Sequence, residues 1–266
     1  MSIIDAHTHA FPDDLAARAI AALEEDCPWK AVADGRVASL IESMNACEVD
    51  VSVVATIATK PDQVKGIFRW CGKIHSDRIE PLPSVHPDTP KAAKWVEKIA
   101  KAGFAGIKLH PMYQGFAADD PRLDELYAAA AECGLMVQSH CGRDIGFPAN
   151  DDRASPRRFR RVIERFPKLR LLCTHMGGWQ AWDEVEKHLI GTGVYMETSF
   201  SLGPRGCQAE RIASMIRRHG AGRVMLGSDW PWNTQAEEID NVRKLPLGKG
   251  EIQGILCSNA ARLLGY

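Results

Sequence analysis

The chain lacks several features that would point directly to a function class. Its eight cysteines include no Cys-x-x-Cys pair, which argues against a zinc ribbon and against a small disulfide scaffold. No apolar stretch approaches the roughly 20 residues that a membrane span needs. Lysine and arginine (33) nearly balance aspartate and glutamate (34), so no charge excess favours nucleic acid or an anionic membrane.

Two further absences concern targeting and nucleotide binding. Met1 leads directly into "SIIDAHTH", without the basic and apolar regions of a signal peptide. Because most cysteines also sit inside apolar runs, we expect a cytoplasmic protein with reduced thiols. The first apolar run ends in "HTHAF" rather than in a glycine-rich phosphate turn, which argues against an open nucleotide-binding sheet. The expected partner is a small-molecule substrate, with a homo-oligomer as a further option.

Short apolar runs alternate with longer amphipathic stretches along the whole chain. The runs are rich in Val, Ile and Leu and too short for helices, which is typical of parallel strands buried on both faces. Eight such units fill the 266 residues and predict a single-domain (β/α)8 TIM barrel over residues 1–266. The predicted strands are Ile3–His9, Val51–Ile57, Ile79–His86, Phe104–His110, Leu135–His140, Leu169–His175, Val194–Ser199 and Val224–Asp229.

The stretches between these runs supply the helices and one unusual insertion. Residues 10–34 are longer than a normal strand-to-helix loop, so we expect a loop that covers the top of the barrel as a lid or substrate wall. Helical periodicity, with glycine or proline at many of the joints, predicts helices at Lys91–Ala102, Leu123–Cys133, Pro156–Phe166, Trp182–Leu189 and Glu210–His219.

Ionisable side chains gather where the predicted strands end, at the face on which barrel enzymes build their active sites. A buried strand has no use for such residues unless something satisfies them. His7 and His9 are two residues apart on one strand, so both point into the barrel mouth and suit a divalent ion such as zinc. His140 and Asp229 approach from other strands and can complete the coordination, leaving one position open to water. The seven residues at this rim are His7, His9, Lys108, His110, His140, His175 and Asp229.

Five short motifs resemble the amidohydrolase superfamily: "DAHTH", "GIKLHP", "SHCG", "CTHMGG" and "GSDWP". More narrowly they resemble its amidohydrolase-2 branch, which includes the aminocarboxymuconate-semialdehyde decarboxylase-like metal-dependent hydrolases. The resemblance runs from Asp5 to the C-terminal helix. It implies His7, His9, His140 and Asp229 as metal ligands and Asp229 as a proton acceptor in catalysis. His175 would be either a catalytic proton-transfer residue or a ligand of a second metal.

Lys108 leaves the number of metal ions open. In binuclear relatives a carboxylated lysine on the fourth strand bridges two ions, and the strand-five and strand-six histidines bind the second. In the single-metal branch the lysine faces the substrate as a cation. We expect one ion, most simply Zn²⁺, with two ions as the alternative.

Three weaker candidates belong to the substrate wall. His110 shares the face of Lys108 and is either a substrate contact or a loop histidine before Pro111. Arg143 can clamp a substrate carboxylate or form a surface salt bridge. Trp230 can line an aromatic pocket or pack against neighbouring helices.

Three functions fit these residues. We favour a hydrolase that uses a metal-activated water on a small-molecule amide, ester or lactone. A metal-dependent, non-oxidative decarboxylase of a small unsaturated or aromatic carboxylic acid is the main alternative, although the chain is short for that group. A non-catalytic metal-binding barrel fits least well, because the ligand set leaves an open position and keeps a proton-transfer partner.

Overall fold

The structure, a computed structural model, describes residues 2–25 and 27–266. In this part of the chain, eight strands follow one another in parallel, and each lies inside one of the runs predicted from the sequence. They are β1 (Ile4–Thr8), β2 (Val51–Ala55), β3 (Ile79–Leu82), β4 (Gly106–Leu109), β5 (Met136–Ser139), β6 (Arg170–Cys173), β7 (Tyr195–Glu197) and β8 (Val224–Met225).

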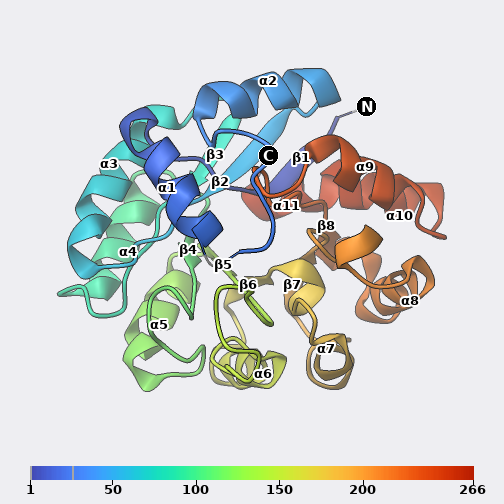
Figure 1. Cartoon of the computed structure of the whole chain (residues 1–266). Helices are drawn as coiled ribbons and strands as arrows, with labels where there is room; N and C mark the ends of the chain where they lie inside the picture. Colours follow the sequence, from blue (N-terminus) through green and yellow to red (C-terminus); the bar gives the residue numbers. More distant parts are fainter. Residues whose placement is uncertain (1, 26) are drawn as a thin grey trace.

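The strands form two ladders, one of β1 to β3 and one of β4 to β8, and isolated bridges join the ladders at both seams. At one seam Ser84 bridges to Lys108. At the other, Thr8 bridges to Trp230, and the backbone N–H of Ala6 donates to the carbonyl of Leu226 at 2.8 Å. Figure 1 shows the resulting ring of strands with helices around it, which is the predicted (β/α)8 barrel.

Most of the helices cover the outside of this ring, and the five that the sequence predicts are confirmed, with ends that agree closely. Among the described residues, no helix has both the length and the apolar character that a bilayer crossing requires. The helices are α1 (Asp13–Glu25), α2 (Val37–Cys47), α3 (Val64–Ile74), α4 (Ala92–Lys101), α5 (Asp124–Glu132), α6 (Pro156–Arg165), α7 (Trp182–His188), α8 (Ala209–His219), α9 (Gln235–Arg243), α10 (Lys249–Gln253) and α11 (Asn259–Leu264).

Two sequence predictions need correction. The strands are shorter than expected, because their polar C-terminal residues leave the ladders and face the barrel mouth; β4, for example, ends at Leu109, before His110. Residues 10–34 are not simply a loop, since α1 occupies half of the segment. The alanine-rich sequence of α1 has high helix propensity, and Asp13 and Asp14 in its first turn favour the positive end of the helix dipole.

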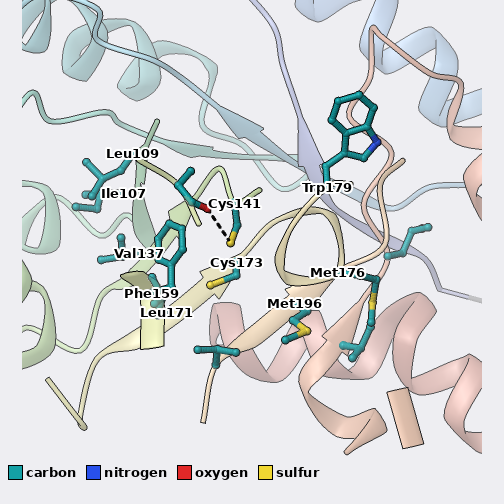
Figure 2. Close-up of a cluster of buried hydrophobic side chains, with 14 of the residues drawn as sticks. Ile107, Leu109, Val137, Cys141, Phe159, Leu171, Cys173, Met176, Trp179 and Met196 are labelled. Carbon is teal, nitrogen blue, oxygen red and sulfur yellow. Dashed lines mark hydrogen bonds between the residues drawn. The ribbon is translucent and has the colours of Figure 1, made fainter. Parts of the chain in front are cut away.

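Buried apolar side chains form two clusters, one inside and one outside the strand ring. The outer cluster joins the strands to the helices, and Figure 2 shows part of it, with Val137 and Leu171 beside Phe159 of α6. The inner cluster includes Ile4, Val53, Met136, Leu172 and Met225, and α11 packs against it with Ala260 and Leu263. Since Ile4, Met136 and the α11 residues lie at strand starts or below them, the apolar filling occupies the N-terminal half of the barrel and leaves the C-terminal end to polar side chains.

Candidate active site

The register of β1 brings the two histidines of "HTH" to the barrel mouth. The pairing of β1 with β2 shifts between Asp5 and Thr8, a bulge of the kind often found beside active sites. Ala6, inside this interval, packs in the inner cluster, while His7 and His9 line the cavity above it. The bulge therefore lets one short strand contribute both to the core and to the site.

Hydrogen bonds on the outer edge of each ring fix the tautomers of these two histidines. Nδ1 of His9 lies 2.8 Å from the carbonyl oxygen of Ala55, which can only accept. Nδ1 of His7 lies 3.0 Å from a carboxylate oxygen of Glu197 and donates to it. In the neutral rings both Nε2 atoms then carry a lone pair and no proton, although they lie 3.1 Å apart.

Asp229 adds a carboxylate to this pair. Its Oδ1 lies 3.1 Å from Nε2 of His9 and 3.4 Å from Nε2 of His7, and it is buried without a hydrogen-bond partner. The residue has a left-handed backbone (φ +59°), which costs free energy for any residue with a Cβ, although aspartate and asparagine tolerate it better than most. Asp5 stabilises that turn from below, because its carboxylate accepts bonds from the backbone N–H and the hydroxyl of Ser228 at 3.0 and 2.5 Å.

His140 and His175 repeat the same arrangement after β5 and β6. Nε2 of His140 lies 3.0 Å from the carbonyl of Arg143 and must donate to it. The hydroxyl of Ser199 donates to Glu197, so it accepts from Nδ1 of His175 at 2.8 Å. The inner nitrogens, Nδ1 of His140 and Nε2 of His175, are therefore bare and lie 3.2 Å apart. Burial lowers the pKa of His140 to about 3 and that of His175 to about 4, which keeps both rings neutral at physiological pH.

Glu197 connects the two histidine pairs, and the sequence did not show that it reaches them. Its fully buried carboxylate accepts from His7 Nδ1, from the backbone N–H of His175 at 2.8 Å, and from the backbone N–H of Ser199 at 2.6 Å. His175 also has a left-handed backbone (φ +58°), so this bond helps to hold it. The available signal was a charged residue inside the apolar run "VYMETS", since such a residue needs partners.

Lys108 reaches the same centre from β4. Its Nζ lies 3.1 Å from Nε2 of His7, and its side chain is buried. Burial lowers the pKa of Lys108 to about 8. Among the described side chains around the histidines, Lys108 alone donates a hydrogen bond to one of the unprotonated imidazole nitrogens.

The donor set fits a divalent cation. Bare nitrogens and a carboxylate oxygen at 3.1–3.4 Å repel one another unless a positive charge lies between them. Ligands at about 2.0–2.1 Å from a tetrahedral zinc ion are about 3.4 Å apart, which matches these separations. The ligand atoms of His7, His9 and Asp229 lie within 4.8 Å of one another, and His140 belongs to a neighbouring group. In each histidine the ring nitrogen that points away from the centre makes a hydrogen bond. Bonds of this kind orient the histidine ligands in metal sites.

That neighbouring group contains Asp144, which the sequence gave no reason to single out. The ring of His110 stacks on that of His140 with centroids 4.3 Å apart, and Nε2 of His110 lies 3.3 Å from Asp144 Oδ2. Burial lowers the pKa of His110, although Asp144 opposes this. The lone pair of an imidazole nitrogen lies in the plane of its ring. Because the His110 and His140 rings are stacked in parallel planes, their lone pairs do not converge on one point, and the two histidines are poorly placed to bind the same ion.

A cavity of about 1140 Å³ opens above the centre and is lined by all the residues predicted for the site except Trp230. Trp230 is only 2% exposed and packs in the outer hydrophobic cluster, so it does not line the cavity as the sequence predicts. Trp232 lines the cavity instead. The exposed side chain of Arg143 lines the cavity and forms no hydrogen bond or ion pair with the described residues.

Comparison with known proteins supports the same fold. Residues 4–266 match the sequence family described as amidohydrolase. A search of proteins with curated descriptions found no match. An uncharacterized TIM-barrel protein from Bordetella bronchiseptica is similar in structure, with a TM-score of 0.77, 20% identity and coverage of 100% of this chain and 99% of the other.

Two other solved structures of this fold are enzymes by name. A 5-carboxyvanillate decarboxylase from Novosphingobium aromaticivorans with bound manganese has a TM-score of 0.73 and 14% identity, covering 99% of this chain and 97% of its own. A probable 2-pyrone-4,6-dicarboxylic acid hydrolase from Acinetobacter baumannii has a TM-score of 0.67 and 15% identity, and both chains are covered completely (100%). At these identities the likeness shows the fold, while the family match spans nearly the whole sequence. The chain therefore belongs to the amidohydrolase family and is an enzyme.

Proposed function

We propose that the chain is a metal-dependent hydrolase of a small-molecule amide, ester or lactone, with the ion held by His7, His9, His140 and Asp229. The observation that carries this proposal is the cluster of His7, His9 and Asp229, whose bare nitrogens and unpartnered carboxylate oxygen lie 3.1–3.4 Å apart. His140 adds a bare Nδ1 that lies 3.2 Å from Nε2 of His175. We propose one Zn²⁺ ion, because neutral imidazoles with a carboxylate suit zinc better than magnesium or calcium. A relative with bound manganese makes that ion the first alternative to test.

When bound, a divalent ion supplies Lewis-acid chemistry that activates water and polarises a carbonyl oxygen. Asp229 lines the cavity; its Oδ1 faces His7 and His9, and its second carboxylate oxygen is the base that accepts the proton of the attacking water. The same carboxyl can return that proton to the leaving oxygen or nitrogen.

His175 and Lys108 have complementary roles in this proposal. His175 presents a bare Nε2, so it accepts a hydrogen bond or a proton before it can donate one. Lys108 presents an ammonium group beside the centre and can orient a carbonyl or carboxylate oxygen of the substrate. Once an ion takes the lone pair of His7 Nε2, Lys108 no longer donates to that nitrogen, so its ammonium group is available to the substrate.

A decarboxylase is the second candidate, and one feature favours it. Lys108 and Arg143 line the same cavity as the rings of Trp179 and Trp232, which suits an aryl carboxylate. A related structure is named as a decarboxylase of an aromatic acid. A decarboxylase must deliver a proton to the carbon that loses CO2. The hydrogen bonds around Asp229, His140 and His175 leave these side chains as proton acceptors, which favours the hydrolase.

The direct test is a panel of lactones, esters, amides and aryl carboxylates, offered to the zinc-loaded enzyme. We expect acid release that depends on the ion and incorporates one oxygen atom from labelled water into the product. Asp229→Asn should abolish this release, and Asp240→Asn, on exposed α9, should leave it unchanged. Release of CO2 without incorporation of labelled oxygen would replace the hydrolase by the decarboxylase.

A further inference from the structure

α1 presents an apolar face to the cavity rather than to the protein core. Of the residues of this helix, only Ala16 is buried. The cavity that contains His7 and Asp229 is lined from α1 by Asp14 and Arg18 and by four apolar residues, Leu15, Ala19, Ala22 and Leu23. Their spacing of four, three and one residues places them on a single face of the helix.

α3 contributes a second apolar stretch to the cavity wall. Ile67 and Trp70 of α3 line the same cavity, and Gly66 beside them leaves room, since a Cβ there would meet no atom within 4 Å. Figure 1 shows α1 lying across the end of the barrel. From Leu15 to Leu23 the helix rises about 12 Å, so the apolar wall extends well beyond the catalytic groups.

The cavity is larger than a short substrate needs. Its volume of about 1140 Å³ exceeds the roughly 300–1,000 Å³ of sites that enclose a drug-sized ligand. An apolar helix face that borders water is unfavourable, and an apolar ligand relieves this cost by displacing the water.

We propose that the substrate carries an elongated apolar arm, an alkyl or aryl-alkyl chain, that lies between α1 and α3 while its hydrolysable group reaches the metal centre. This inference rests on the proposed function and narrows its substrate class to hydrophobic amides, esters or lactones. Continuity of the α1 face with the cavity that holds His7 and Asp229 identifies the arm as part of the substrate rather than as a separate ligand.

The test measures binding and needs no turnover. Straight-chain carboxylates from butanoate to decanoate, as analogues of a hydrolysis product, are titrated into the zinc-loaded enzyme by calorimetry. Burying one methylene group contributes about 0.8 kcal/mol, so Kd should fall about twofold to fourfold with each added methylene. A Kd that does not change with chain length would overturn the proposal.

Two phenylalanine substitutions on the same helix locate the arm. Ala19→Phe fills the cavity face and should flatten the chain-length dependence, whereas Ala17→Phe, on an exposed position outside the cavity lining, should preserve it. Leu23→Ser gives a milder change at the same wall and should weaken the binding of decanoate more than the binding of butanoate. Equal effects of Ala17→Phe and Ala19→Phe would contradict the placement.

Failure of this inference differs from failure of the proposed function. Chain-length-dependent binding without hydrolysis of any ester, amide or lactone would support the apolar arm and reject the hydrolase. Hydrolysis of short lactones together with a flat binding series would keep the hydrolase and reject the arm.

Discussion

Nδ1 of His7 donates a hydrogen bond to Oε1 of Glu197 across 3.0 Å, in a part of the barrel where neither side chain is more than 1% exposed. This bond sets which nitrogen of His7 faces the centre. Through Ser199 the same carboxylate also sets the tautomer of His175. One buried glutamate thus orients two of the inward-facing imidazoles.

Glu197→Gln should weaken metal binding without removing a metal ligand. The Glu197 carboxylate accepts four hydrogen bonds on its two oxygens. A glutamine has only one acceptor oxygen there, so its NH2 group would face a hydrogen-bond donor. Loss of a partner that orients a metal ligand typically costs 10- to 100-fold in affinity, and we expect a change of about that size in the Kd for Zn²⁺. Competition with a chromophoric chelator measures it.

The matched control for that variant is Glu164→Gln. Glu164 is 55% exposed and pairs with Arg160 on the surface of α6, where an ion pair contributes little. Its zinc affinity should equal that of the wild type. Equal affinity in Glu197→Gln as well would mean that Glu197 does not orient His7.

Gly227→Ala should disturb the same contact by steric means. A Cβ at Gly227 would lie 2.0 Å from Oε2 of Glu197 and 3.1 Å from Cβ of His7, so one of these groups must move. We expect the free energy of unfolding to fall by about 1–3 kcal/mol, as in other overpacked cores, together with weaker zinc binding.

Urea unfolding of Gly227→Ala is compared with that of Gly72→Ala. Gly72 lies in α3, where an added Cβ meets no atom within 4 Å, so alanine should stabilise the helix by about 0.5–1 kcal/mol. If both variants unfold like the wild type, the close packing of Gly227 against Glu197 is wrong.

The neutral, buried His175 gives the metal-free protein a defined pH dependence. Its pKa is lowered to about 4 by burial, against an ordinary value near 6.5, so below that ordinary value the unfolded chain binds a proton that the folded chain does not. The contribution of His175 to stability is therefore complete above pH ~6.5 and is lost as the pH falls toward about 4.

His175→Gln should remove about 1.4 kcal/mol per pH unit from the slope of the free energy of unfolding over that window. Urea titrations in chelator at several pH values between neutrality and the acid limit measure the slopes. His188→Gln, on the surface of α7, is the control. A slope in His175→Gln equal to that of the wild type would show that His175 is protonated in the folded protein.

Asp229→Asn should have opposite effects in the presence and absence of metal. An asparagine amide can donate to Nε2 of His9 or His7, where the carboxylate meets bare nitrogens, and asparagine tolerates the left-handed backbone well. The metal-free variant should therefore be more stable than the metal-free wild type by about 1 kcal/mol. Addition of Zn²⁺ should raise the melting temperature of the wild type far more than that of the variant. The reverse order of stability without metal would reject the bare-nitrogen arrangement.

The fold follows from local patterns that a sequence displays directly. Buried parallel strands read as short runs of Val, Ile and Leu, so β2 and β5 are clear from their residues alone. The ends of the strands are less clear, because a residue such as His9 continues the alternation of β1 although it lies beyond the ladder. The prolines and the length of residues 10–34 suggest a loop, whereas the helix propensity of "LAARAIAAL" is the signal that indicates α1.

The site is only partly visible in the sequence, for a physical reason. His7, His9, His140 and Asp229 stand at strand ends, and the barrel geometry alone brings them to one face. Glu197 and Asp144 depend on which face a short strand presents and on the path of a loop, and these are set by tertiary packing. The bulge in β1 is a further example, since pairing with β2 is what creates it.

The most direct measurement is the number of metal ions per chain. The protein is stripped with chelator, reconstituted with excess Zn²⁺, passed over a desalting column and measured by elemental analysis. We expect one ion per chain in the wild type and almost none in Asp229→Asn. Two ions per chain would make Lys108 and His175 part of a second metal site, and no retained ion would contradict the metal centre itself.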